Sequence, residues 1–155
     1  MQNNFLKNKK IILSAGASGI GLATVKLLLS QGAFVYTCDI DKKNINKLKK
    51  NSYFNKKLFI SECDASKEDE VKKFYKEISY KTKKIDGLIN NIGIAGPTSP
   101  LEKIKSDDWE KTIHVNVNSH FYFTKYAIPM IKKSKNGSII NIASLAAKYG
   151  MPYAA

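Results

Sequence analysis

The sequence has 155 residues, 43% of them hydrophobic, so it is long enough for one domain with a core and too short for two. Its net charge is +13, and its basic residues are all lysines spread over several helical faces. This argues against nucleic-acid binding, because arginine supplies the bidentate base contacts. No apolar run approaches the roughly 18 residues of a membrane span, and the polar N-terminus lacks a secretory h-region, so we expect a cytoplasmic protein without a membrane partner.

Apolar segments of strand length alternate with amphipathic segments of helix length. The predicted strands cover residues 9–14, 33–39, 57–64, 86–90 and 137–143. The predicted helices cover residues 19–32, about 41–51, a segment opened by a capping box of Ser66 with Asp69, and a long segment from Ser106, as its cap, to about 133. Strands this apolar, separated by helices, predict an α/β fold with a parallel sheet covered on both faces.

Neither the cysteines nor the histidines have the spacing of a metal site. Cys38 and Cys63 also lack redox-motif spacing, and we interpret them as reduced, apolar core residues. His114 and His120 lie six residues apart on one predicted helix, so they do not share a face, and neither forms a recognisable triad with Ser144. The sequence therefore predicts no metal centre.

The junction of the first strand and first helix reads SAGASGIG, residues 14–21. Parallel sheets bind ligands at the carboxyl ends of their strands, where a glycine turn that opens a helix lets a pyrophosphate approach backbone N–H groups. The glycines fall at 16, 19 and 21, which is not the G-x-G-x-x-G spacing, so the turn alone also fits a tight structural junction. The second strand ends in Asp39, where a carboxylate can accept hydrogen bonds from ribose hydroxyls. Together the two features favour a dinucleotide site.

Further motifs follow in chain order. They are Asp64 with Ala65 after the third strand, the run Asn90, Asn91, Ile92 and Gly93 after the fourth, Asn116 in HVNVNSHF, and Ser144 in GSIINIAS. With the glycine turn, they make the chain resemble the short-chain dehydrogenase/reductase family, classical type, over essentially its whole length. The resemblance implies a Rossmann-like, doubly wound, three-layer αβα fold that is truncated after the fifth strand. Residues 1–155 would then be a single NAD-binding domain, incomplete at its C-terminus.

The resemblance also assigns site residues. The implied cofactor-binding residues are Ser14, Ala15, Gly16, Ser18, Gly19, Ile20, Gly21, Asp39, Asp64, Ala65, Asn91, Ile92 and Gly93. The implied catalytic residues are Ser144, which would polarise the substrate oxygen, and Asn116, which would hold a proton-relaying water. Ala15 and Ile92 depart from the family motifs, which have glycine and alanine there. We expect Gly16 to supply the flexibility displaced from position 15.

The end of the chain bears on the chemistry. In the family, a tyrosine lies about thirteen residues after the serine and a lysine follows four residues later, which corresponds to positions 157 and 161. If the turn before PYAA is shorter than in the family, Tyr153 would instead be the catalytic tyrosine. The lysine that should follow the tyrosine is absent from residues 1–155 in both alignments. We therefore expect the N-terminal part of a longer enzyme, inactive by itself.

The implied function is an NAD(P)-dependent oxidoreductase that transfers a hydride between the nicotinamide and a secondary alcohol or ketone. Asp39 favours NAD, because a carboxylate repels a 2′-phosphate, although Lys42 and Lys43 could soften the repulsion. The alternatives are a non-catalytic dinucleotide-binding or interaction module and a sugar-nucleotide epimerase, whose glycine spacing differs. Loop 94–105 lies on the substrate side and identifies no ligand.

The resemblance further implies a homodimer or homotetramer, because family members pair through the long helix that bears Asn116. This helix carries more apolar and aromatic surface than one buried face needs, in Phe121, Tyr122, Phe123, Tyr126 and Met130. The alternative is that most of these residues belong to the domain's own core.

Overall fold

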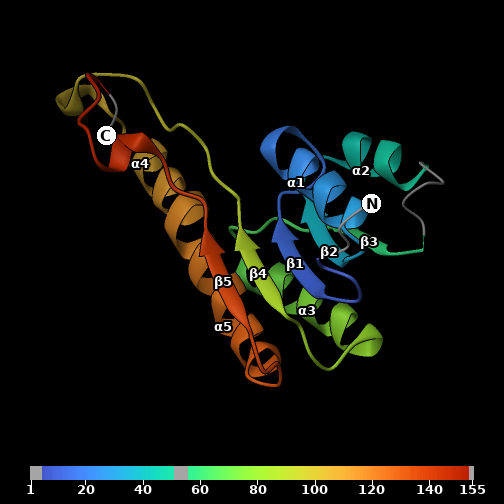
Figure 1. Cartoon of the computed structure of the whole chain (residues 1–155). Helices are drawn as coiled ribbons and strands as arrows, with labels where there is room; N and C mark the ends of the chain where they lie inside the picture. The colour runs from blue at the N-terminus through green and yellow to red at the C-terminus, as the bar shows by residue number, and fades with distance from the viewer. Residues whose placement is uncertain (1–4, 51–55, 154–155) are drawn as a thin grey trace.

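The computed structural model describes residues 5–50 and 56–153 and confirms the α/β class. Five parallel strands form one sheet in the order β3-β2-β1-β4-β5 (Figure 1). The strands are β1 (Lys10–Ser14), β2 (Phe34–Asp39), β3 (Leu58–Glu62), β4 (Gly87–Asn90) and β5 (Ser138–Asn141). The chain builds outward from β1 to β3 and then returns to the other side of β1, so the strand order reverses between β1 and β4.

Helices cover both faces of the sheet, which confirms the three-layer αβα architecture (Figure 1). On one side lie α1 (Gly19–Ser30) and α2 (Lys42–Lys49), and on the other α3 (Glu68–Lys81) and α5 (Ser119–Ile131). Side chains of successive strand residues point to opposite faces. Ile12 accordingly packs in the cluster with α3 and α5, whereas Ile11 and Leu13 pack in the cluster with α1. This alternation assigns each apolar strand residue to one face.

Two predicted helix caps are wrong. α3 begins at Glu68 after Lys67, and the Ser66 hydroxyl donates to Asp64 Oδ1 at 2.6 Å instead of capping the helix. Ser66 therefore belongs to the turn after β3 and not to the helix cap. Three acidic residues in the first turn of α3 stabilise the N-terminus of this helix through the helix dipole. α4 (Ser106–Ile113) likewise begins at Ser106 itself, after Lys105, without a side-chain cap.

The long predicted helix is three consecutive segments. α4 passes into a π-helical segment, His114–Asn118, which passes into α5. Short 3₁₀ helices lie before it at Leu101–Lys103 and after β5 at Leu145–Ala147. None of the described helices has the length and apolarity needed to cross a membrane.

Most of the aromatic residues of α5 pack within the chain. Phe123 is fully buried, Met130 is buried, and Tyr122 and Tyr126 lie against the same core cluster. Only Phe121 of the five is strongly exposed, at 60%. The core interpretation therefore holds for four of these residues, and the excess apolar surface that we inferred from the sequence is mostly intradomain packing.

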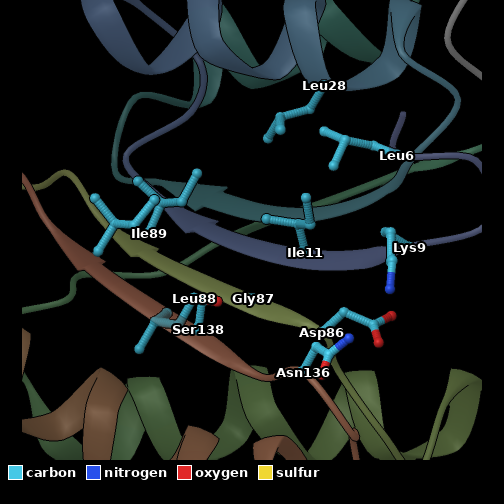
Figure 2. A pocket seen from close by; sticks show the side chains of 11 residues that line it. Leu6, Lys9, Ile11, Leu28, Asp86, Gly87, Leu88, Ile89, Asn136 and Ser138 are labelled. Atoms are coloured by element: carbon cyan, nitrogen blue, oxygen red, sulfur yellow. The ribbon is translucent and has the colours of Figure 1, made fainter. Parts of the chain in front are cut away.

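The face of the sheet that carries α1 is open beside β4 and β5. A pocket of about 270 Å³ lies there, lined by Leu6, Ile11, Leu28 and Ile89 among others. Figure 2 shows Leu28 of α1 and Leu6 on the side of the sheet toward which Ile11 points. The edge strand β5 is exposed at all four of its residues.

Candidate functional site

Two loops meet where the strand order reverses. The glycine turn follows β1 and the loop that starts at Asn91 follows β4, and these strands are paired from Ile11 with Gly87 to Leu13 with Ile89. Because paired parallel strands end on the same edge of a sheet, both loops leave it side by side. β2 and β3 also end on this edge. The predicted cofactor-binding residues, which come from four separate segments, therefore lie along one edge.

Ser14 and Asn91 join the two loops. Ser14 is fully buried, and its Oγ accepts hydrogen bonds from the backbone N–H of Asn91 at 3.0 Å and of Ile92 at 3.2 Å. In return, Asn91 Nδ2 donates to the carbonyl oxygens of Ser14 at 3.2 Å and Ala15 at 3.1 Å. Buried polar groups are satisfied in this way in stable folds. These four bonds hold the glycine turn in a fixed position relative to the β4 loop.

The turn has an alanine where the backbone is left-handed. Ala15 has a φ of 56°. This conformation costs a residue with a Cβ about 1–2 kcal/mol. Gly16, which we expected to supply the flexibility, is not left-handed, and a Cβ there would overlap Thr37 Oγ1 of β2. That expectation is wrong: Ala15 bears the unfavourable φ itself, and Gly16 is required because the turn packs directly on Thr37.

We expect Ala15→Gly to raise the free energy of unfolding by about 1 kcal/mol, because glycine adopts a left-handed φ without steric penalty. The gain is less than the full penalty, since glycine loses more backbone entropy on folding. Chemical denaturation measures it. Ala23→Gly on the exposed side of α1 is the matched control and should lower stability instead. Equal losses for both variants would contradict the assignment of strain to Ala15.

The other two glycines of the turn, Gly19 and Gly21, have different roles. A Cβ on Gly21 would collide with the Ala15 carbonyl oxygen and approach Asn91 Nδ2, so this glycine permits the close packing of α1 on the turn. Gly19 has a φ of 49° and faces open space. Ser18 and Ile20 beside it are exposed. The turn can therefore admit a phosphate group close to its backbone.

The Asp39 carboxylate is buried and held by backbone N–H groups. Its Oδ2 accepts from Ala17 at 2.9 Å and its Oδ1 from Asp41 at 3.1 Å. Each carboxylate oxygen retains a lone pair for a further donor, such as a hydroxyl. Lys42, which we considered as a counter-charge for a phosphate here, places its ammonium 3.2 Å from Glu62 Oε1.

Asp64 and Ala65 lie directly after β3. Asp64 Oδ1 accepts from the backbone N–H of Ser66 at 3.0 Å as well as from its hydroxyl, and Lys67 Nζ lies 3.4 Å from Oδ2. Burial raises the pKa of the Asp64 carboxyl, but the hydrogen bonds from Ser66 and Lys67 outweigh it, and the pKa lies below its usual value. Asp64 is therefore ionised and fixed at neutral pH. Ala65 is buried.

Asn116 lies in the π-helical segment, and its side-chain amide forms two hydrogen bonds with the loop after β4. Its Oδ1 accepts from the Ile94 N–H at 2.8 Å and its Nδ2 donates to the Ile94 carbonyl at 2.9 Å. One amide hydrogen and one lone pair remain for a water. His120 Nε2 lies 2.9 Å from the Ile92 carbonyl oxygen. No pattern of residues predicts this histidine contact, because it joins positions 28 apart in the chain.

Ser144 follows β5, the neighbour of β4, and is exposed. Its Oγ accepts from the Ala146 N–H at 3.2 Å and so caps the 3₁₀ helix that follows. Tyr153, the alternative tyrosine, is exposed, and its backbone carbonyl accepts from the Ser99 N–H at 3.0 Å. Within residues 5–50 and 56–153, no hydrogen bond joins Ser144 to Asn116 or Tyr153. The structure thus connects the cofactor-binding residues to one another more closely than the catalytic ones.

Cys38 and Cys63 are free and buried. The hydrogen bond with Cys63 and burial raise the pKa of the Cys38 thiol well above its usual value, so it remains neutral. In the described part of the chain, no three histidine, cysteine or acidic side chains are grouped so that they could hold a metal ion.

The family model for short chain dehydrogenases matches residues 9–155. The chain belongs to this family. It is 34% identical over 148 residues to a 3-oxoacyl-acyl-carrier-protein reductase of Thermotoga maritima, covering 95% of this chain and 60% of that protein. It is 33% identical over 150 residues to a 3beta-hydroxysteroid dehydrogenase of Mediterraneibacter gnavus, covering 96% of this chain and 54% of that protein.

Among solved structures, ElxO with NADP bound superposes with a TM-score of 0.86 at 26% identity, over 95% of this chain and 60% of that chain. This short-chain dehydrogenase sequence therefore spans less than two thirds of the length of each of these three proteins.

Proposed function

We propose that this protein is an oxidoreductase that binds a nicotinamide dinucleotide and transfers a hydride between it and a secondary alcohol or ketone. One observation carries the proposal: the glycine turn, Asp39 and Asn91 are hydrogen-bonded together at the reversal of strand order. The names of the relatives, a reductase and a dehydrogenase, support it. In this proposal, residues 1–155 are one nucleotide-binding domain.

The residues present fit such a cofactor. The open backbone at Gly19 suits a pyrophosphate, and the preorganised Asp39 carboxylate suits ribose hydroxyls. Asp64 with Ala65 would border the adenine, and Ile92 with Gly93 would border the cofactor from the β4 loop. The cofactor, when bound, supplies the hydride. Because Asp39 accepts hydroxyl hydrogen bonds and repels phosphate, we propose NAD as the favoured form.

The chain's own part in the reaction would be to hold the substrate oxygen and move a proton. Ser144 would donate a hydrogen bond to that oxygen, and Asn116 would hold a water through its remaining amide hydrogen or lone pair. The proton donor would be a tyrosine whose pKa a lysine lowers. Residues 145–155 contain no tyrosine followed four residues later by a lysine. We propose that the 155-residue chain alone does not turn over substrate.

We also propose pairing of two copies through α4 and α5. Val117, Phe121 and Ile128 are exposed on this helical stretch, at spacings of four and seven residues. Residues so spaced share a helix face. These exposed residues support a contact smaller than the sequence suggested, because most of the aromatic residues of α5 pack against the core of the same chain.

The cofactor proposal predicts that Asp39→Ala weakens NAD binding by about 1.5–3 kcal/mol, the usual value of a hydrogen bond to a charged group. NADP binding should weaken less, or strengthen, because the substitution also removes a negative charge. Calorimetric titration of both cofactors into both proteins measures this, at a temperature at which both are folded.

Asp41→Ala is the matched control. It removes the carboxylate that caps α2 but leaves Asp39 in place, so NAD binding should change little. Equal losses of NAD and NADP affinity on Asp39→Ala would count against the ribose role. Absence of any cofactor binding to the unsubstituted protein would overturn the proposed function.

A further inference from the structure

Lysines are concentrated in the segments that lead into the strands. These segments are residues 5–9, 31–33, 56–57, 82–86 and 132–137. Because all five strands are parallel, the segments lie together at the edge of the sheet opposite the candidate cofactor site (Figure 1). We call it the amino edge. It contains one acidic residue, Asp86, and nine lysines, which are Lys7, Lys9, Lys56, Lys57, Lys83, Lys84, Lys132, Lys133 and Lys135.

Hydrogen bonds join these segments into one continuous surface. Ser134 Oγ donates to Asp86 Oδ1 at 2.7 Å, and the backbone N–H of the first residue of β1 donates to Asp86 Oδ2 at 2.9 Å. On the other side of β1, the Asn8 N–H and Lys57 Nζ both donate to the Gly32 carbonyl oxygen, at 3.2 Å and 3.0 Å. The amino edge therefore extends without a break from the start of β5 to the start of β3.

The positive charge of the amino edge has little to offset it. Seven of the nine lysines are exposed, and the other two are half-buried. Within residues 5–50 and 56–153, only Lys84 of the nine forms an ion pair, with Asp86 at 3.8 Å, and the Asp86 side chain is only 9% exposed. At the opposite edge, the first turns of α3 and α4 carry five acidic residues between them. The net positive charge of the chain is thus unevenly distributed and lies mainly at the amino edge.

Helix termini explain only part of this distribution. Lysines near a helix C-terminus interact favourably with the helix dipole, within about one turn of its end. This can account for the lysines that directly follow α3 and α5. It does not account for Lys7, Lys9 and Lys135, which lie outside any helix and beyond its last turn. A binding surface accounts for all nine lysines.

Two aromatic side chains stand out at the same edge. Phe5 and Tyr80 are 77% and 76% exposed, more than any other large hydrophobic residue that the structure describes. Phe5 begins the segment before β1, and Tyr80 lies in the last turn of α3, which leads into residues 82–86. Exposed aromatic rings among lysines are typical of surfaces that lie on anionic bilayers, where rings enter the interface and ammonium groups contact the headgroups.

We infer that the amino edge docks on an anionic lipid bilayer. The contact is peripheral and needs no spanning helix, so it revises the expectation, drawn from hydropathy, of no membrane partner. Lysine suits it, because its compact charge attracts anionic headgroups without the planar geometry that arginine brings to nucleic acids. The inference goes beyond the proposed function and does not depend on it. Docking by this edge leaves the opposite edge, with the candidate cofactor site, facing away from the bilayer.

The test measures sedimentation of the full-length protein with vesicles. One set contains phosphatidylcholine and phosphatidylserine in equal parts, and the other phosphatidylcholine alone. The edge variant combines Lys83→Gln, Lys133→Gln and Lys135→Gln. The matched control removes three exposed lysines of the opposite edge and combines Lys43→Gln, Lys103→Gln and Lys105→Gln. All six positions are exposed, so the fold is not at risk.

The unsubstituted protein should bind the anionic vesicles and not the neutral ones. The edge variant should bind them about 100-fold more weakly, since each lysine near an anionic surface contributes about fivefold. The control variant has the same net charge and should bind nearly as well as the unsubstituted protein. Replacing Phe5 and Tyr80 together by alanine should weaken binding by about tenfold, because the rings no longer enter the interface. Raising the salt concentration should weaken binding of the unsubstituted protein.

Three outcomes would overturn the inference. The first is that the unsubstituted protein fails to bind the anionic vesicles. The second is an equal loss in the edge and control variants, because net charge alone would then explain the binding. The third concerns a duplex DNA oligonucleotide, titrated in parallel by fluorescence anisotropy. If the edge variant loses affinity for the oligonucleotide but keeps its affinity for the vesicles, the amino edge is a nucleic-acid surface instead.

Discussion

Gly16→Ala should lower the free energy of unfolding by about 3 kcal/mol or more. The added Cβ would overlap Thr37 Oγ1 and lie 3.0 Å from Val25 Cγ2, both in the interior. Overpacking of this kind costs about 1–3 kcal/mol. Thr37 Oγ1 also donates to the buried Leu13 carbonyl, and displacing it would leave a buried acceptor unsatisfied at a further cost of about 1–3 kcal/mol. Chemical denaturation measures the loss.

Gly19→Ala is the matched control, three residues along the same turn. A Cβ there meets nothing within 4 Å, so only its left-handed φ opposes alanine, at about 1–2 kcal/mol. Adding Thr37→Ala to Gly16→Ala should recover part of the loss, because it removes the overlapping hydroxyl. A Gly16→Ala variant as stable as Gly19→Ala would show that the turn can move away from Thr37.

Ser144→Ala in the full-length protein should reduce kcat by about 10²–10³-fold, the usual effect of removing one donor to a reacting oxygen. NAD affinity should not change, because Ser144 lies after β5 and contributes nothing to the glycine turn or Asp39. Steady-state turnover with a panel of secondary alcohols and ketones, followed by cofactor absorbance, measures the first effect. Titration of NAD measures the second.

The substitution also removes the cap on the 3₁₀ helix that follows, because Ser144 Oγ accepts from Ala146. Ser144→Thr is the matched control that keeps both roles, since threonine keeps a hydroxyl that can both cap and donate. Activity and stability should both recover toward the values of the unsubstituted protein. If Ser144→Ala retains full turnover, the catalytic role assigned to this serine is incorrect.

Much of the fold follows from patterns within short segments of sequence. The apolar strands and the helices between them predict the five-stranded parallel sheet, and strand ends place Asp39 and Asn91 at the same edge. The correct family follows from ordered motifs. The strand and helix patterns are local in sequence, and the family resemblance depends only on the order of the motifs along the chain. A single sequence is therefore enough to predict both.

The errors concern positions at which a specific contact, either distant or local in the sequence, overrides the preference that the residue pattern indicates. Ala15 takes a left-handed φ that alanine disfavours, because Asn91 holds its carbonyl and Gly21 packs beneath it. Ser66 has the sequence pattern of a helix cap, yet the neighbouring Asp64 takes its hydroxyl.

The π-helical segment His114–Asn118 has a consequence for how this chain can vary in length. Each residue of an α-helix turns it by about 100°, since a turn takes about 3.6 residues. A π-helical turn takes about one residue more than an α-helical turn, so this segment holds one extra residue while α4 and α5 keep their rotational register. Loss of one residue within the segment would therefore restore regular α-helix with little rotation of α4. A residue added to the regular part of α5 before Phe123 would instead rotate Asn116 by about 100° and take it away from Ile94 while Phe123 remained in the core. A change of one residue in length is therefore tolerated within the π-helical segment and not in the start of α5 that follows it.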